Sequence, residues 1–255
     1  LPLGIELAAA RAQVLTCVAT AAEIRRGSSE LATRQRDIPE RQRSLRAVVE
    51  SSVAALSPVE RRLFEGLSVF PHGFSAAAAA GIVGATATQL ASLVDKSLVR
   101  EIGGRYDLHE VLQRFAAEAL ARQPDLHAEL QGRHSHHFAR WLQAITDQAA
   151  TPGAESAWMT AVADDFANLR SAWAWASAER HGSDLSLLLE GVFRFMNVRG
   201  HFREGVDWFS SASERLAPDP QATDERGRLA MRLSVARARF LLELGQAEAA
   251  VPLFE

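Results

Sequence analysis

The sequence contains a single cysteine, Cys17, which excludes an internal disulfide and a cysteine-based zinc framework. Cys17 lies in an apolar stretch and is interpreted as a small buried hydrophobic residue. No stretch approaches the roughly 18 consecutive apolar residues of a membrane span. The N-terminus also lacks the basic start and apolar core of a signal peptide. We therefore expect a soluble protein of the reducing cytoplasm, with no membrane partner.

Lysine is equally scarce, because Lys96 is the only one among 28 basic residues. The chain has no Gly-x-x-x-x-Gly-Lys-[Ser/Thr] loop to hold nucleotide phosphates. Without that loop, phosphoryl transfer has no positioning machinery. We therefore expect no ATP hydrolysis, and no cofactor bound by this chain alone. The formal net charge of -3 provides no overall positive field for nucleic acid.

The composition, 47% hydrophobic and 23% charged, is typical of a folded globular protein, and 255 residues suffice for more than one domain. The chain opens on Leu1 without an initiator Met and stops at Glu255 within an expected helix. We therefore expect a segment of a longer protein. Helical spacing of apolar residues predicts a helix over 3–26, a loop over 28–43 and a second helix over 45–56.

Residues 57–108 carry the clearest local pattern. Ser57-Pro58-Val59-Glu60 is a capping box with proline at the first helical position, which predicts a helix that ends before Pro71. Two further helices are expected over 75–83 and 86–96. Two short strands, 98–102 and 105–108, flank the turn Gly103-Gly104. Three helices followed by a two-stranded wing are typical of a winged helix, a variant of the helix-turn-helix.

The remaining chain is predicted to be helical, over 110–122, 126–149, 155–180 and 185–198. The stretch that starts at Gly200 resembles the one that starts at Gly245. In each, glycine closes one helix, and a small residue five positions later (Gly205, Ala250) lets the next helix pack closely. Stacked helix pairs of this kind are typical of tetratricopeptide-like repeats. The expected fold class is mainly α: a helical segment, a winged helix with a small wing, and a helical repeat array.

Three passages resemble the STAND class of signal-transduction ATPases, which includes NB-ARC proteins and large bacterial regulators of the LuxR and SARP types. Residues 1–11 look like the helical-domain motif built on Gly-x-Pro, with its glycine lying before Leu1. Residues 56–70 and 93–99 look like that family's winged helix. Residues 106–110 stand where the family has Met-His-Asp, with Leu108 and Glu110 in place of Met and Asp. Residues 165–170 look like the start of the bacterial members' repeat region.

The resemblance implies three domains: a helical-domain remnant over 1–56, the winged helix over 57–122, and truncated repeats over 123–255. It assigns Pro2 to the adenine and His109 to the phosphates of ADP, in an intact parent that binds ADP or ATP with Mg. His109 is expected at a strand-to-helix junction, where helix N–H groups and an imidazole can both meet an anion. The winged helix would relay nucleotide state. The repeats would bind an inducer protein or peptide, or a neighbouring subunit by self-association.

Two other functions remain open. Winged helices often bind DNA directly, which makes a DNA-binding transcription factor the main alternative. However, helix 86–96 carries Lys96 as its only base, beside Asp95, and the wing adds only Arg100 and Arg105. DNA affinity requires several phosphate-neutralising bases on one face, so we do not expect DNA binding by this segment. The third possibility is a freestanding helical scaffold.

Several side chains have both a structural and a functional interpretation. His134, His136 and His137 suggest a metal site, but no nearby carboxylate or Cys partner is expected, and a structural His beside Phe138 and Trp141 is favoured. The tryptophans Trp158, Trp173 and Trp175 are interpreted as core anchors rather than a ligand cage. Asp164-Asp165 is interpreted as a solvated helix end.

Overall fold

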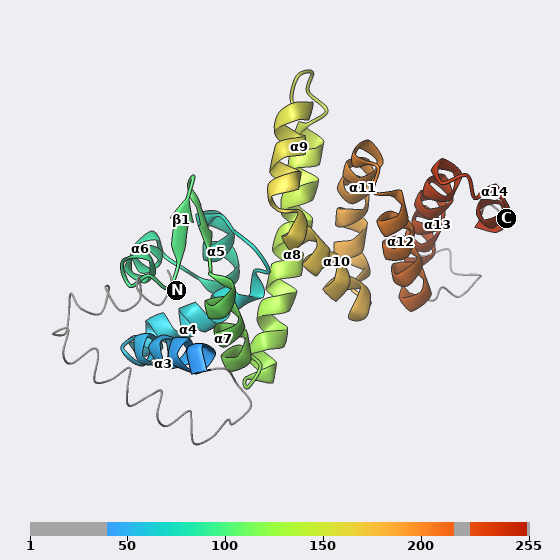
Figure 1. The fold of residues 1–255 in the computed structure, drawn as a ribbon. Helices are drawn as coiled ribbons and strands as arrows, with labels where there is room; N and C mark the ends of the chain where they lie inside the picture. Colours follow the sequence, from blue (N-terminus) through green and yellow to red (C-terminus); the bar gives the residue numbers. More distant parts are fainter. Residues whose placement is uncertain (1–39, 217–224, 254–255) are drawn as a thin grey trace. The chain divides into compact units, whose positions relative to one another are not determined.

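The computed structural model describes residues 40–216 and 225–253, and within them the fold is mainly α with one small antiparallel sheet (Figure 1). The chain divides into two compact units, Leu1–Leu130 and Gln131–Glu255. The helix expected over 3–26, together with Pro2 and Cys17, lies outside the described residues.

The N-terminal unit contains the helices of the expected winged helix. Its elements are α3 (Glu40–Ala54), α4 (Pro58–Gly66), a 3-10 turn (Leu67–Val69), α5 (Ala76–Val83), α6 (Ala87–Asp95), β1 (Arg100–Ile102), β2 (Arg105–Asp107), α7 (Glu110–Leu120) and the start of α8 (Pro124–Gln148). The predicted loop to residue 43 is wrong at its end, since α3 already begins at Glu40. The Glu-Arg-Gln-Arg run there consists of good helix formers, which outweighs its polarity.

Side-chain caps begin the three helices where the sequence predicts them. The Ser57–Glu60 capping box is present in both directions at the start of α4. Ser75 caps α5 by accepting from the Ala78 amide, and Thr86 forms a second capping box with Gln89 at the start of α6. Each cap satisfies amides that a helix N-terminus leaves without a partner.

The wing is confirmed as an antiparallel hairpin, with Arg100 opposite Asp107 and Ile102 opposite Arg105. Gly103 and Gly104 form its turn at φ of 59° and 78°, a region that favours glycine. An isolated bridge joins Phe74 to Tyr106, so the segment between α4 and α5 lies along β2, on the side away from β1. This order of helices, bridge and hairpin is the winged-helix arrangement.

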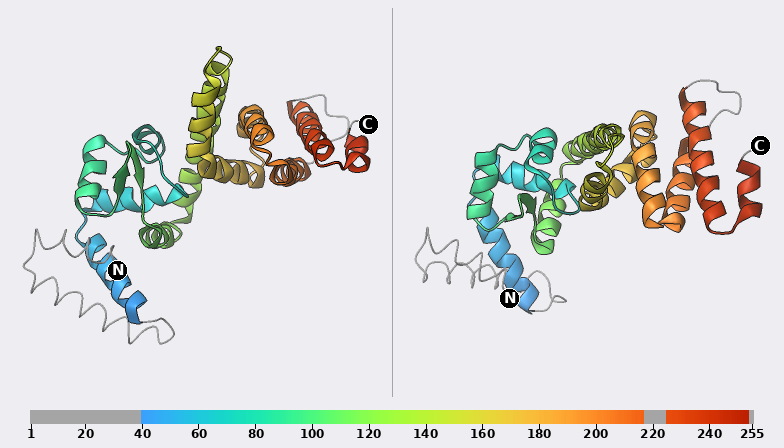
Figure 2. Two further views of the ribbon diagram at one scale, coloured as in Figure 1. Left: turned by 45° about the horizontal axis from the view of Figure 1, so that its top comes forward. Right: turned by 90° about the horizontal axis from the view of Figure 1, so that it is seen from above.

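The C-terminal unit is entirely helical in its described residues. It comprises the rest of α8, then α9 (Glu155–Asp164), α10 (Phe166–Ala178), α11 (Gly182–Arg199), α12 (Phe202–Leu216), α13 (Glu225–Glu243), α14 (Ala247–Ala250) and a 3-10 turn (Val251–Leu253). Helices α11 to α13, coloured orange to red, lie next to one another in both further views (Figure 2).

The single helix predicted over 155–180 is wrong, because the chain breaks at Asp165 (φ -108°, ψ 13°). Asp165 is also not a solvated helix end, since it is only 7% exposed. Its carboxylate accepts a hydrogen bond from the Asn168 side chain at 2.9 Å. This hydrogen bond supplies the partner that the buried Asp165 carboxylate needs at the break between α9 and α10.

The close packing of α12 on α11 expected after Gly200 is confirmed at Gly205, where a Cβ atom would lie 3.2 Å from Sδ of Met196 on α11. The tighter contact, which was not expected, is with α13. A Cβ atom there would lie 2.3 Å from the ring of Phe240, so only glycine allows α12 to approach α13 this closely. Gly200 and Gly245 both end helices with positive φ, 71° and 73°. Ala250 is fully buried against Ala238 and Leu241.

Among the described residues, no single helix is both long and apolar enough to cross a membrane.

Candidate functional site

Helix α6 is the third helix of the winged helix, the position that reads the major groove in DNA-binding members. Its exposed residues carry no positive charge: they are Ala87, Thr88, Ala91 and Asp95. Among the described residues of α6 and its two caps, the one base is Lys96, the C-cap residue.

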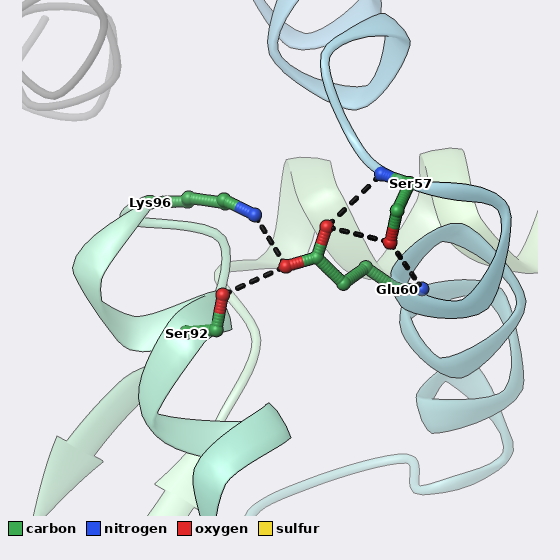
Figure 3. Close-up of polar contacts among 4 residues, drawn as sticks. All are labelled: Ser57, Glu60, Ser92 and Lys96. Atoms are coloured by element: carbon green, nitrogen blue, oxygen red, sulfur yellow. Dashed lines mark hydrogen bonds and ion pairs between the residues drawn. The ribbon is translucent and has the colours of Figure 1, made fainter. Parts of the chain in front are cut away.

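Lys96 is committed to an ion pair within the unit (Figure 3). Its ammonium contacts Oε1 of Glu60 on α4, and the Ser92 hydroxyl donates to the same oxygen at 2.7 Å. The other carboxylate oxygen, Oε2, accepts from the Ser57 amide at 3.0 Å. The Glu60 side chain is 17% exposed. One carboxylate thus caps α4 and joins it to the end of α6.

These contacts shift the titration of Glu60. Its pKa is lowered from 4.5 to about 2, chiefly by the hydrogen bond from Lys96 and then by those from Ser92 and Ser57. The carboxylate is therefore charged at any physiological pH. Because it sits against the ammonium, it cancels most of the field that Lys96 would offer a phosphate.

The cations of the wing are also engaged within the unit. Arg100 pairs with Asp107 across the hairpin at 2.9 Å, and the Arg105 guanidinium donates to the Gly73 carbonyl at 2.9 Å. All three residues of β1 are exposed, and one of them, Ile102, is an apolar residue that is 64% exposed. Thus Lys96 and Arg100 each have a carboxylate partner within the unit, which lowers the positive charge that α6 and the wing offer DNA, and Ile102 adds an apolar side chain to the exposed strand.

His109 occupies the junction predicted for it. It is the N-cap residue of α7, where its Nδ1 accepts a hydrogen bond from the Val111 amide at 3.3 Å. An accepting Nδ1 leaves the proton of the neutral ring on Nε2. The half-buried ring can therefore donate from Nε2 to an anion. Pro2, its expected partner at a nucleotide, lies outside the described residues.

The histidines of α8 have structural partners. His134 is 2% exposed, lies 3.3 Å from the Asn168 carbonyl oxygen through Nε2, and packs against the Phe138 ring. Burial lowers its pKa to about 4, so the ring is neutral near pH 7. Within the described ranges, no group of three or more His, Cys, Asp or Glu residues could hold a metal ion. The structural interpretation of His134 is confirmed.

The prediction that no carboxylate lies near these histidines is wrong. Asp184, in the first turn of α11, is fully buried and accepts from the Ser135 hydroxyl at 2.8 Å. His136 and His181 lie 3.1 and 3.2 Å from its two oxygens. Asp184 is 48 residues from His136, so the sequence carries no local signal for this cluster. The carboxylate ties α8 to the start of α11.

The expected role of the tryptophans as core anchors is confirmed for Trp158 and Trp173, each 3% exposed. The Trp158 indole donates to the Thr146 hydroxyl at 3.1 Å, and that of Trp173 to a backbone carbonyl at 3.3 Å. Trp175 is half-buried and packs on Gly132, where its ring lies 3.3 Å from the position of an added Cβ. The rings fill space between helices.

Sequence reasoning missed a groove between α11 and α13, here called the α11–α13 groove. It has a volume of about 560 Å³, and its lining includes Leu189, Glu190 and Phe193 from α11 and Met231, Arg232, Val235 and Arg239 from α13. One pattern in the sequence could have indicated the groove: on α13, the apolar residues Met231 and Val235 alternate with Arg232 and Arg239.

The molecule thus combines a winged helix with a set of packed helix pairs. Comparison with known proteins shows to which class of protein the chain is similar. The chain is 32% identical over 225 residues to "Putative HTH-type transcriptional regulator Rv0890c" of Mycobacterium tuberculosis, and equally to "Putative HTH-type transcriptional regulator Mb0914c" of Mycobacterium bovis. The match covers 84% of this chain and 25% of each relative, so the chain spans about a quarter of their length. No family model and no solved structure matches the chain. The chain is therefore homologous to a segment of proteins named as transcriptional regulators.

Proposed function

We propose that this chain is a regulatory segment of a transcriptional regulator. Its homology to the mycobacterial proteins supports the general role, as does a winged helix in the N-terminal unit. In this proposal the winged helix works through protein contacts and the C-terminal unit binds a regulatory partner. Neither role requires catalysis by this chain.

The observation that carries the protein-contact role is the Glu60–Lys96 pair. In this pair the carboxylate of Glu60 neutralises Lys96, the lysine at the end of α6. The exposed residues of α6 are uncharged or acidic. A DNA reader in this position needs bases that reach phosphates and base edges. A helix that presents alanine and threonine is better suited to packing against another protein surface.

Direct DNA binding through the winged helix is the second candidate, and the relatives' names favour it, since they include the term HTH-type. The two candidates differ in a binding experiment. The whole chain would be mixed with a pool of random-sequence duplexes at low salt, and bound DNA would be separated by gel shift and sequenced.

The protein-contact role predicts weak retardation and no enriched sequence. Strong, salt-sensitive retardation with an enriched motif would establish the second candidate instead. Glu60→Gln and Lys96→Ala are the matched variants, because the first frees the Lys96 charge and the second deletes it. If α6 faces DNA, these two variants change the affinity in opposite directions. If it does not, both leave the affinity unchanged.

In its narrower form, the proposal makes the parent a STAND-type ATPase whose ADP is contacted by Pro2 and His109. The resemblance of residues 1–120 supports this form, and so does the donor position of His109 Nε2 at the start of α7. In a longer protein that contains this segment, His109→Ala should weaken ADP retention and raise basal transcriptional output. Unchanged ADP occupancy together with unchanged output would remove this form and leave the broader proposal standing.

A further inference from the structure

The α11–α13 groove exposes apolar surface that no described part of the chain covers. On α13, Met231 and Val235 are 64% and 48% exposed, and both line the groove. They lie four residues apart, so they stand one above the other on the same helix face. The opposite wall carries Phe193, which stacks on the Phe240 ring at 4.9 Å and is thereby held in place. A contiguous apolar strip with a fixed aromatic wall is typical of a binding surface.

The groove is also positively charged along its α13 side. Arg232 donates to the neutral Ser186 hydroxyl at 3.2 Å, and no carboxylate of the described residues lies within ion-pair distance of it. Arg239 contacts Glu243 at 3.4 Å, but both side chains are well exposed, at 61% and 41%. Such exposed pairs contribute little and exchange readily. Glu190 is the acidic residue among those that line the groove.

The spacing of the two arginines limits what fits. Seven residues separate them on one helix, which corresponds to about 10 Å along its axis. The carboxylates of a ligand would have to be separated by a similar distance. An extended peptide covers it in about three residues, and a helical one in about seven. Between them, apolar side chains would meet Met231 and Val235.

We propose that the α11–α13 groove binds a segment of a partner protein that carries two carboxylates about 10 Å apart with apolar side chains between them. The carboxylates contact Arg232 and Arg239, and the apolar side chains pack between Phe193 and the exposed strip of α13. This proposal rests on the proposed function, because it names the chemistry of the regulatory partner that the C-terminal unit binds.

The test is selection from a random twelve-residue peptide library displayed on phage, with the whole chain as the immobilised target. Enriched peptides would be synthesised and titrated by fluorescence anisotropy. We expect enrichment of peptides with paired Asp or Glu around apolar residues. Their affinity should fall at least about tenfold for the double variant Arg232→Glu, Arg239→Glu, since each lost pair is replaced by a repulsion. The matched control is Arg203→Glu, Arg215→Glu on α12, which changes the net charge equally outside the groove and should leave binding unchanged.

Three results would overturn the proposal. The first is the absence of enriched peptides, and the second is enrichment without an excess of acid. The third is equal binding to the groove variant and the wild type, with far-UV circular dichroism verifying that both are folded. Sedimentation velocity over a range of concentrations tests another occupant: a dimer that the groove variant loses would assign the surface to a second copy of this chain. The DNA experiment is independent, so tight DNA binding would refute the protein-contact role of the winged helix without affecting the peptide result.

Discussion

The ion pair between Glu60 and Lys96 makes a prediction that separates charge from helix capping. Glu60→Gln keeps an amide oxygen at the third helical position, which capping boxes accept, but removes the negative charge. Any loss of stability in this variant therefore reports the contacts of the carboxylate with Lys96 and Ser92 more than the cap itself. The matched variant Lys96→Met removes the same pair from the other side.

The size of the effect follows from the lowered pKa of Glu60, 4.5 to about 2. One pKa unit corresponds to about 1.4 kcal/mol, so the full shift is worth about 3 kcal/mol. The Lys96 side chain is 40% exposed, and solvent screening reduces the expected loss to about 1–2 kcal/mol. Because the folded pKa lies below the unfolded one, the stabilisation is complete above pH 4.5 and is lost as the pH falls towards 2.

The tryptophans allow an assay that follows each unit separately. All five lie between residues 141 and 208, in the C-terminal unit, so tryptophan fluorescence reports that unit alone, whereas far-UV circular dichroism reports both. In urea at pH 7, Glu60→Gln should shift a dichroism transition and leave the fluorescence transition in place. At pH 2.5 the difference from wild type should shrink. The reasoning is refuted if the dichroism transition at pH 7 moves by less than about 0.3 kcal/mol, or if the Lys96→Met and Glu60→Gln effects add fully in the double variant.

Three further predictions concern the C-terminal unit, each measured by urea unfolding with tryptophan fluorescence. Gly205→Ala should lower the free energy of unfolding by about 1–3 kcal/mol, because the added Cβ would meet the Phe240 ring. The control is Gly182→Ala, where the nearest neighbour of an added Cβ is 3.6 Å away and the expected loss is under about 0.5 kcal/mol. Equal losses in the two variants would contradict the packing argument. The pKa of His134 is lowered from 6.5 to about 4, so this unit should lose stability as the pH falls from 6.5 to 4, by about 3 kcal/mol at most, and His134→Gln should flatten the profile. Asp184→Ala should lower the free energy of unfolding by about 1–3 kcal/mol, since the buried Ser135 hydroxyl then keeps only the Ala172 carbonyl, at 3.3 Å, as an acceptor; a change under about 0.5 kcal/mol would argue against a role for this carboxylate in holding the unit together.

Local signals account for the parts of the fold that the sequence predicts well. Ser57 and Glu60 are three residues apart, so their mutual capping depends only on the first turn of one helix. The same holds for the turn at Gly103-Gly104 and for the helix ends at Gly200 and Gly245, where the positive φ suits glycine. The break at Asp165 was missed although Asn168, which bonds to its carboxylate, lies only three residues away; the burial of this pair beside His134 depends on another helix and has no local signal.

The candidate sites also divide into features that depend on local sequence and features that depend on contacts between distant residues. The position of His109 at a helix start was predictable from its place after a strand and before an amphipathic run. The ion pair of Lys96 was not predictable, because its partner Glu60 lies 36 residues away and contacts it only when α4 packs beside α6. The cluster at Asp184 and the α11–α13 groove likewise depend on helices brought together from distant parts of the chain.

The sequence by itself thus determined the class of fold, since helix periodicity, caps and glycine turns act within a few residues and survive any arrangement of the helices. The tertiary structure alone decided which charges are available to a partner. It neutralised Lys96, buried Asp184 among a serine and two histidines, and left Arg232 beside exposed apolar side chains. The physical reason is that the field of a charge depends on what lies within a few ångströms of it in space, and only folding sets those neighbours.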